Sequence, residues 1–248
     1  MIYDKYTDLC LQAVKDEEVF KTFKGNTACT YMLEHVTYEQ GLGYLSEIKR
    51  LQPKLLKHIE CFATNDSLGT PQMFWYDELN MEISPSTLRY VKVLADLVTH
   101  FGSLDDLDIV EIGIGYGGQC KIINDYFVPK SYTLIDLPEV LALAKKYLIC
   151  HGIENIVLRS HRSLLHRDYD LCISNYCFTE ISRQDQNFYA KNIIEHSAKG
   201  YMTCNYLDQR IKERAMTSKE IWVLKKDGFF VPEVPLTAPH NAIYLWTS

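Results

Sequence analysis

The sequence lacks several features that mark particular classes of protein. Its 248 residues include 26 Lys and Arg against 32 Asp and Glu, so it lacks the basic surplus that nucleic-acid binding favours. It contains no apolar run of about 18 residues, the length that a membrane-spanning helix needs. The opening residues MIYDKYTDLC carry two Asp and precede no apolar stretch, unlike a secretory signal. We therefore expect a cytoplasmic protein with no membrane span and no nucleic-acid partner.

Cysteine pairing motifs are also absent. The eight cysteines form no CxxC pair, and several lie in apolar segments such as YDLCISNYC. Free Cys is among the most buried residue types, so we interpret these residues as reduced thiols of the core. The sequence thus predicts neither a disulfide framework nor a zinc site.

The chain does contain enough apolar material for one large core with a smaller cap. Hydrophobic residues make up 47% of it and charged residues 23%, as in ordinary globular proteins. Residues 1–103 show helical periodicity and no clear strand alternation, and we predict that they form a helical cap. Residues 7–23 predict a helix behind an Asp8 cap, and two shorter helical segments follow. In SPSTLRYVKVLADLVTHFG, Pro85 suits a first helical turn and Gly102 a helix end.

From residue 104 onward, short apolar runs alternate with helical patterns. Strands are expected at LDIVEI, YTLID, NIVLR, YDLCIS, GYMTCNY, FFVPEV and AIYLW. This alternation indicates a mostly parallel sheet with helices on both faces. No helix separates the last two strands, so they fit an antiparallel pair at the sheet edge. We predict an α/β fold with a seven-stranded Rossmann-like sheet over residues 104–248.

The stretch VEIGIGYGGQ, residues 110–119, follows the first expected strand. Gly113, Gly115 and Gly118 satisfy the spacing G-x-G-x-x-G, and Asp136 follows at the end of the second strand. An acid at that place can hold ribose hydroxyls. These features fit a nicotinamide dinucleotide as well as S-adenosyl-L-methionine.

Glu111 favours the second ligand. A carboxylate at the end of the strand would repel an anionic pyrophosphate, whereas it would stabilise the sulfonium and α-amino groups of S-adenosyl-L-methionine. Gly117 adds a G-x-G-x-G spacing that suits a nucleoside without a diphosphate. Little chain remains for the separate substrate domain that a dehydrogenase usually needs. An NAD(P)-dependent oxidoreductase and a non-catalytic binding protein of the same fold stay as alternatives.

Four strings carry a resemblance to a known family: SPSTLRYVKVL, VEIGIGYGGQ, LIDLPEV and ISNYCFTEI. They resemble class I S-adenosylmethionine-dependent methyltransferases, and among these the sugar O-methyltransferases. The resemblance runs from about Leu68 to the last residue. It implies S-adenosyl-L-methionine as cofactor and a hydroxyl of a sugar or glycosylated small molecule as methyl acceptor. The sugar and the oligomeric state, including a homo-oligomer, stay open.

The expected cofactor residues lie in the glycine loop and at the strand ends. The glycines either cradle the cofactor or serve a tight turn with positive φ. Asp136 would accept both ribose hydroxyls, whereas its rival role is to cap the helix that starts at Pro138. The full predicted set is Glu111, Gly113, Gly115, Tyr116, Gly117, Gln119, Asp136, Leu137, Ser160, Ser174 and Asn175.

Some of these roles rest on the resemblance. Leu137 would lie against the adenine ring. Ser160 and His161 fall where adenine-edge contacts usually occur in this superfamily, or they lie on a loop surface. Ser174 and Asn175 would hold the amino-acid end of the cofactor.

Methylation of a sugar hydroxyl needs a base, because the hydroxyl is a poor nucleophile at neutral pH. A group that removes its proton accelerates such a step by about 100-fold or more. We rank Glu180 and His161 first and His240 next. Each of the histidines, His166 included, also fits a surface role, and Glu180 could instead cap or pair at the start of a helix. A divalent metal could activate the hydroxyls instead, but no compact ligand cluster indicates one, and we predict none.

Acceptor contacts are expected from aromatic and basic residues. Trp75 and Tyr76, in PQMFWYDEL, could pack on a sugar face or within the core. Arg89 and Tyr90 would close over the cofactor or acceptor, or lie on the surface. Tyr176, in SNYCFTEI, would shape the methyl site, although a buried tyrosine more often belongs to a core.

Overall fold

A computed structural model describes residues 2–160, 167–205 and 215–247. The chain divides into two compact units. The unit that we call helical comprises Met1–Ser103, Gly115–Phe127 and Leu137–Glu154. The unit that we call the sheet unit comprises Leu104–Ile114, Val128–Asp136 and Asn155–Ser248. The domain boundary predicted between residues 103 and 104 stays a prediction. Residues 115–127 and 137–154, which follow the first two strands of the sheet, group with the helical unit.

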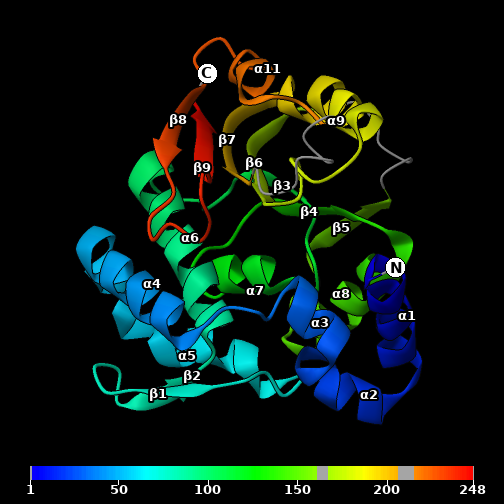
Figure 1. The fold of residues 1–248 in the computed structure, drawn as a ribbon, viewed down its shortest axis with the longest axis vertical. Helices are drawn as coiled ribbons and strands as arrows, with labels where there is room; N and C mark the ends of the chain where they lie inside the picture. The colour runs from blue at the N-terminus through cyan, green and yellow to red at the C-terminus, as the bar shows by residue number, and fades with distance from the viewer. Residues whose placement is uncertain (1, 161–166, 206–214, 248) are drawn as a thin grey trace. The chain divides into compact units, whose positions relative to one another are not determined.

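The helical unit contains short helices and one hairpin (Figure 1). Its elements are α1 (Ile2–Lys15), α2 (Glu17–Thr22), η1 (Phe23–Gly25), α3 (Thr27–Met32), α4 (Tyr38–Leu51), η2 (Pro53–His58), α5 (Ile59–Ala63), η3 (Thr64–Ser67), β1 (Phe74–Tyr76), β2 (Met81–Ile83), α6 (Pro85–Phe101), α7 (Gly118–Asn124) and α8 (Pro138–Cys150). None of the described helices is both long and apolar enough to cross a bilayer.

The predicted helix over residues 7–23 is wrong in its extent. The chain leaves the helical conformation at Asp16, whose side chain accepts hydrogen bonds from Glu18 N at 2.8 Å and Val19 N at 3.4 Å. Asp8 lies inside α1 and caps nothing. A carboxylate that bonds the first free N–H groups of a helix stabilises a new start, so α2 begins directly after Asp16.

Helix α6 is confirmed where the sequence placed it. Ser84 accepts from Thr87 N at 3.1 Å, Pro85 occupies the first turn, and Gly102 ends the helix at φ +78°. The hairpin of β1 and β2 just before it was not predicted. Each of its strands has three residues, too few to show an alternating pattern.

The sheet unit has the seven strands that the sequence predicts. Its elements are β3 (Asp108–Ile112), β4 (Ser131–Asp136), β5 (Ile156–Ser160), β6 (Tyr169–Asn175), α9 (Arg183–Tyr189), η4 (Ala190–Ile194, a π-helical turn), β7 (Ser197–Cys204), α11 (Ser218–Trp222), β8 (Phe229–Pro232) and β9 (Ala242–Trp246). The strand order is β5-β4-β3-β6-β7-β9-β8 (Figure 1). The first five strands of this order pair in parallel, and β9 pairs antiparallel with both β7 and β8. The predicted fold class is therefore confirmed.

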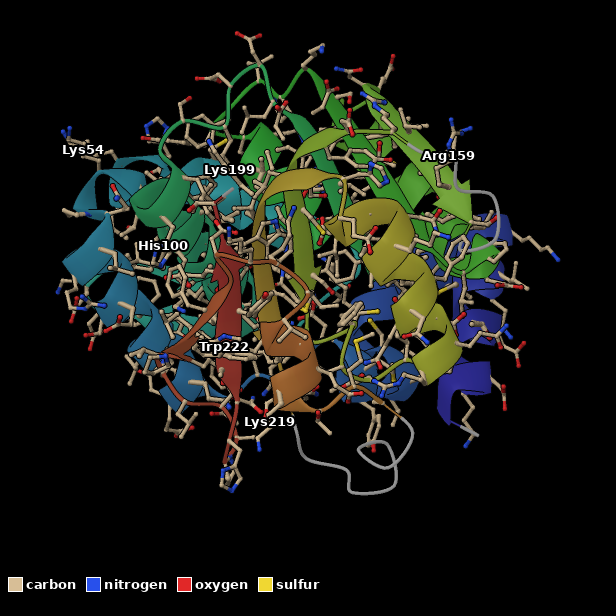
Figure 2. All side chains as sticks on the ribbon, turned by 90° about the horizontal axis from the view of Figure 1, so that it is seen from above. Lys54, His100, Arg159, Lys199, Lys219 and Trp222 are labelled. Carbon is tan, nitrogen blue, oxygen red and sulfur yellow. The ribbon has the colours of Figure 1, made fainter. Side chains whose placement is uncertain are left out.

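Close packing around Trp246 holds the antiparallel strand in the sheet. The indole is fully buried, and its N–H donates to Ser197 O at 3.0 Å. A Cβ at Gly200, which pairs with Trp246, would lie 1.9 Å from the indole ring. Only glycine leaves room for the ring at this position. On α11, by contrast, Lys219 and Trp222 are exposed (Figure 2).

The strand order reverses at β3, which lies between β4 and β6. In open α/β sheets, ligands bind beyond the carboxyl ends of the strands at such a reversal. The carboxyl ends of these three strands are therefore the place to look for a site.

Candidate cofactor and acceptor site

Two carboxyl groups stand near the carboxyl ends of the neighbouring strands β3 and β4. Glu111 is the penultimate residue of β3, and Asp136 is the last residue of β4. Asp136 Oδ2 accepts from Ile114 N at 2.9 Å, and Gly113 N donates to Ile135 O at 2.9 Å. The start of the glycine loop is thus tied to the end of β4, next to both carboxyl groups.

The charge of Glu111 depends on its surroundings. Its side chain is 2% exposed, and its Oε2 accepts from the Tyr132 hydroxyl at 2.8 Å. Burial raises the pKa of Glu111 to about 8; the Tyr132 hydrogen bond opposes this rise, and the Asp136 carboxylate adds to it. Without a bound cation, this carboxyl group is therefore mostly protonated near pH 7. A cation beside it would favour the ionised form. The negative charge inferred from the sequence would thus develop when a cation binds.

The backbone conformation of the loop by itself explains why glycine occupies two of its positions. In the sheet unit, Gly113 has φ +77°, and a Cβ there would lie 2.2 Å from the Cβ of Cys177. In the helical unit, Gly117 precedes α7 at φ +95°. Side chains other than glycine rarely adopt these angles. The turn alone accounts for the glycines, so their role as a cofactor cradle stays a prediction.

Two further predicted cofactor residues adjoin Asp136. Leu137 follows it along the chain and is exposed, and Ser160 lies opposite it in the pairing of β4 with β5. Both positions are compatible with nucleoside contacts, and their roles stay predictions.

Tyr116 and Gln119 lie inside the helical unit. The Tyr116 ring is buried, and its hydroxyl donates to Glu34 Oε1 at 2.7 Å. Gln119 is also buried, and its Nε2 donates to Tyr90 O at 3.2 Å. Among the described residues, Gln119 Oε1 has no hydrogen-bond partner. A buried acceptor without a donor is uncommon and suits a ligand that carries N–H groups, such as an ammonium.

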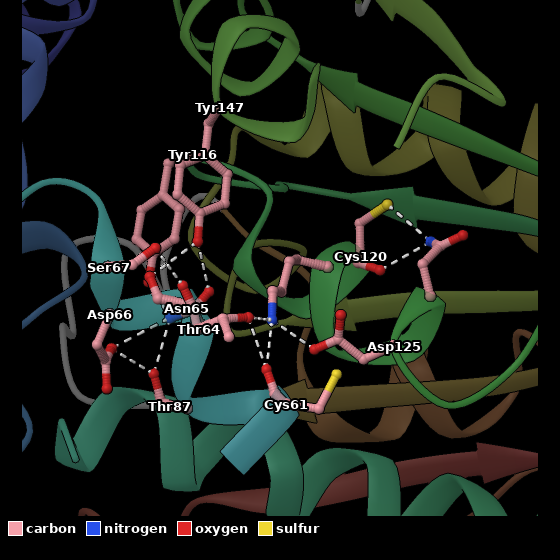
Figure 3. Close-up of polar contacts among 12 residues, drawn as sticks. Cys61, Thr64, Asn65, Asp66, Ser67, Thr87, Tyr116, Cys120, Asp125 and Tyr147 are labelled. Carbon is pink, nitrogen blue, oxygen red and sulfur yellow. Dashed lines mark hydrogen bonds and ion pairs between the residues drawn. The ribbon is translucent and has the colours of Figure 1, made fainter. Parts of the chain in front are cut away.

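The helical unit also holds a buried polar network around Asn65 (Figure 3). Asn65 Nδ2 donates to Thr87 Oγ1 at 2.7 Å, and the Tyr147 hydroxyl donates to Asn65 Oδ1 at 2.7 Å. Thr87 in turn donates to Asp66 Oδ1 at 2.6 Å. Every member has a partner, so the network fixes the packing of α6 against α8 without unpaired polar groups.

Lys24 completes this network. Its ammonium is fully buried, donates to Asn65 O at 2.5 Å, and lies 4.4 Å from the centre of the Tyr116 ring and 4.8 Å from that of Tyr147. Burial lowers the pKa of Lys24. Since its contacts are a carbonyl and two ring faces, the side chain is anchored by the fold.

The predicted acceptor residues of the helical unit differ in accessibility. Trp75 is 50% exposed, whereas Tyr76 beside it is 1% exposed. Arg89 donates to Leu33 O at 2.9 Å, and Tyr90 is buried. Tyr76 thus packs in the core, which is its alternative role, and Trp75 presents a ring to solvent. The surface position given as the alternative for Tyr90 is wrong, because its ring is buried. Acceptor contacts by these residues stay predictions.

The end of β6 is tied to the end of β3 within the sheet unit. The buried Ser174 Oγ donates to Ile112 O at 3.1 Å and accepts from Phe178 N at 3.2 Å. Asn175 Oδ1 accepts from Thr203 Oγ1 at 3.2 Å. These bonds shape the turn after β6. Their donors and acceptors come from the protein, so contact of Ser174 and Asn175 with a cofactor stays a prediction.

The two described base candidates lie in different surroundings. Glu180 accepts a hydrogen bond from Asn205 Nδ2, and His240 is exposed in the loop between β8 and β9. His161 and His166 lie outside the described residues. Within the described part of the chain, no group of three or more His, Cys, Asp or Glu side chains is placed to hold a metal ion.

One residue of this region was not among the site residues predicted from the sequence. Glu233 is 5% exposed and accepts a hydrogen bond from the Tyr176 hydroxyl, 57 positions earlier in the chain. Its one signal in the sequence is a lone carboxylate within the apolar, proline-rich run VPEVPLTAP. A charged residue in such a run needs polar partners when it is buried.

No protein-family profile matches the sequence, and a search of curated proteins finds no relative. Solved structures do resemble the fold. NodS, an N-methyltransferase of Bradyrhizobium japonicum WM9 solved with S-adenosyl-L-homocysteine, is 14% identical over 63% of this chain and 83% of its own, with a TM-score of 0.49. An S-adenosylmethionine-dependent methyltransferase of Clostridium acetobutylicum is 13% identical over 62% of this chain and 87% of its own, with a TM-score of 0.48. An rRNA methylase of Streptococcus thermophilus is 16% identical over 64% and 96%, with a TM-score of 0.47. Likeness at this level says nothing about cofactor or acceptor.

Proposed function

We propose that the chain is an S-adenosyl-L-methionine-dependent O-methyltransferase. The observation that carries the proposal is the pair of carboxyl groups, Glu111 and Asp136, where the strand order reverses. Asp136 is held by Ile114 N, and a carboxylate accepts up to about four hydrogen bonds, enough for two ribose hydroxyls as well. Glu111, with its pKa of about 8, ionises readily beside a cation.

Glu111 disfavours a dinucleotide, whereas Asp136 would suit the ribose of either ligand. A pyrophosphate near Glu111 would hold that carboxyl group in its protonated form. S-adenosyl-L-methionine, when bound, supplies an electrophilic methyl group on a sulfonium. The roles that we assign to the protein are to bind the ribose through Asp136 and to balance the positive charge through Glu111. Tyr116, Gly117 and Gln119 of the helical unit stay predicted contacts.

For the acceptor we propose a hydroxyl of a sugar or of a glycosylated small molecule. The support is the sequence resemblance over residues 68–248. Positioning of this hydroxyl against the methyl group would be the largest contribution of the protein, because transfer needs the reacting atoms close and in line.

Titration calorimetry tests the cofactor. S-adenosyl-L-homocysteine is expected to bind at micromolar concentration, and NADH and NADPH are expected not to bind. Asp136→Asn should weaken the binding by about 10-fold or more, because hydrogen bonds to a charged group contribute about 1.5–3 kcal/mol. Asp168→Asn makes the same chemical change on a side chain that is 94% exposed and serves as the matched control. Binding of NADH in place of the adenosyl compound, or equal affinity of the two variants, would contradict the proposal.

Labelled methyl transfer tests the acceptor. A panel of sugars and glycosylated small molecules is incubated with methyl-labelled S-adenosyl-L-methionine, and the products are read by mass spectrometry. A labelled methyl ether is expected on at least one of them. If the protein binds the cofactor and labels none, a non-catalytic binding protein replaces the enzyme.

A further inference from the structure

The turn after β6 lies against the start of the glycine loop. Strand β6 pairs with β3, and its continuation brings the Cβ of Cys177 to 2.2 Å from where a Cβ of Gly113 would be. Tyr176 immediately precedes this contact. Its side chain is half-buried, and its place at the strand reversal makes it a candidate neighbour of whatever the loop binds.

Tyr176 has a strained backbone. Its φ is +65°, an angle that bulky side chains adopt only at a cost of about 1–3 kcal/mol. Tyr176 N donates to Thr203 O at 2.9 Å, and the hydroxyl donates to Glu233. Both ends of the residue are therefore fixed by the protein, and such strain concentrates at functional sites.

Glu233 is held from its other side. Its Oε2 accepts from Thr237 N at 3.0 Å, from Thr237 Oγ1 at 2.8 Å and from Asn241 Nδ2 at 3.0 Å. Its Oε1 accepts from Tyr176. An ionised carboxylate can only accept, so three loop donors and the phenol fix the direction of every bond. The proton of the Tyr176 hydroxyl points at Glu233.

From this arrangement we propose that Tyr176, with Glu233 behind it, takes the proton of the acceptor hydroxyl. The proposal rests on the proposed O-methyl transfer and names its base. Because the phenol gives its own proton to Glu233, its oxygen can act only as an acceptor toward an incoming group. That group must be a donor, as a sugar hydroxyl is.

The acceptor oxygen forms a bond to the methyl carbon while the bond from that carbon to sulfur breaks. The acceptor proton moves to the Tyr176 oxygen, and the Tyr176 proton moves to Glu233 Oε1. A methyl ether, a neutral thioether and a protonated Glu233 result. Tyr176 is the catalytic residue here, and Glu233 is the positioning residue that receives the proton through it.

Two variants separate this role from simple packing. Tyr176→Phe removes the proton acceptor and keeps the ring. In Glu233→Gln, the three loop donors require the amide oxygen, so the amide nitrogen faces Tyr176 and donates to it. The hydrogen bond is then reversed, and the phenol becomes a donor toward the acceptor. The exposed Leu236, in the same loop, gives the control variant Leu236→Ala.

With the acceptor found in the panel, each of the two variants should lower kcat by about 100-fold or more, since general-base catalysis contributes this much. The KM of the acceptor should change far less, and the affinity for S-adenosyl-L-homocysteine should match that of Leu236→Ala. Equal kcat in Tyr176→Phe and the control would overturn the proposal while the O-methyl transfer stands. Failure of the wild-type protein to label any acceptor would instead remove the O-methyl transfer, and the base with it.

A measurement without acceptor tests the hydrogen bond itself. Tyrosine labelled with carbon-13 at Cζ reports the environment of each phenol by nuclear magnetic resonance, and the resonance missing from Tyr176→Phe belongs to Tyr176. Glu233→Gln should move this resonance, because it exchanges a carboxylate acceptor for an amide donor. Leu236→Ala should leave it in place. If the chemical shift of the Tyr176 resonance is the same in Glu233→Gln as in the wild type, the proposal is wrong even if kcat falls.

Discussion

Lys24 in the helical unit and Glu111 in the sheet unit are both buried ionisable residues, and their neighbours differ in kind. Lys24 contacts a backbone carbonyl and two ring faces. Glu111 has a phenol as hydrogen-bond donor and a second carboxyl group nearby. Burial lowers the pKa of the first and raises that of the second. Each is thus displaced toward its neutral form.

The two residues differ in how much a further charged partner could stabilise their ionised forms. The contacts of Lys24 already suit an ammonium, so a further partner would add little, although burial disfavours its charge. Glu111 lies beside a like charge, so a cation would stabilise it further. A buried charge with complementary neighbours indicates a structural role, and one with like-charged neighbours indicates a ligand of opposite sign. Substitutions at Lys24, Glu111 and Tyr132 can break this contrast.

The largest effect is expected from Lys24→Ala. It removes a buried side chain and leaves a cavity beside Tyr116 and Tyr147, so the free energy of unfolding should fall by about 3 kcal/mol. Lys24→Met keeps the volume, and the Tyr147 hydroxyl, which lies 3.0 Å from the Asn65 carbonyl, can turn its proton to that carbonyl from Asn65 Oδ1. Urea denaturation should therefore place Lys24→Met within about 1.5 kcal/mol of wild type. Equal losses in both variants would mean that the ammonium itself is required.

The next effect concerns binding at different pH values. If S-adenosyl-L-methionine ionises Glu111, its affinity should rise by up to about tenfold per pH unit as pH increases toward 8. Calorimetry in buffers of different ionisation enthalpy should then show proton release on binding. S-adenosyl-L-homocysteine, which lacks the sulfonium, is expected to show a weaker dependence. Glu111→Gln should remove it. A flat profile in the wild type would exclude contact between Glu111 and the cation.

Stability should depend on pH in opposite directions at the two sites. Between about pH 4.5 and 8 the folded chain keeps a proton on Glu111 that the unfolded chain has lost, so stability falls as pH rises. Lys24, with its pKa below the ordinary 10.5, binds its proton more weakly when folded, so stability rises as pH increases toward 10.5. Unfolding curves should show a flatter acid-to-neutral slope in Glu111→Gln and a flatter alkaline slope in Lys24→Met. Wild-type slopes in both variants would contradict the assignment.

The smallest effect is expected from Tyr132→Phe. It removes the hydrogen bond that lowers the pKa of Glu111, so the pH dependence of S-adenosyl-L-methionine binding should move to higher pH. The loss of stability should be about 1 kcal/mol, as for one hydrogen bond. An unmoved binding profile would mean that the phenol does not influence the carboxyl group.

Much of the fold was predictable because its signals are local. Pro85 and Gly102 bound α6, and seven apolar runs become seven strands. The two errors in the predicted secondary structure also have local causes. Asp16 sits in a run of helix-compatible residues, and its capping bonds form only when the chain turns there. The strands β1 and β2 are too short for any period to show.

The site was less predictable because it depends on distant contacts. Glu111, Gly113 and Asp136 belong to one segment of the chain that runs from β3 through α7 to β4. The partner of Tyr176 comes from a loop two strands later, and no spacing links Glu233 to it. The charge state of Glu111 was also beyond reach, since it follows from burial and from Tyr132 across the sheet.

The position of β9 between β7 and β8 has a consequence during synthesis. Ribosomes release β8 before β9, yet β9 is the strand with which β8 pairs. Until residue 246 has emerged, two strand edges remain open for pairing with other chains. Nascent chains that stall in the loop before Ala242 should therefore be substrates for chaperones.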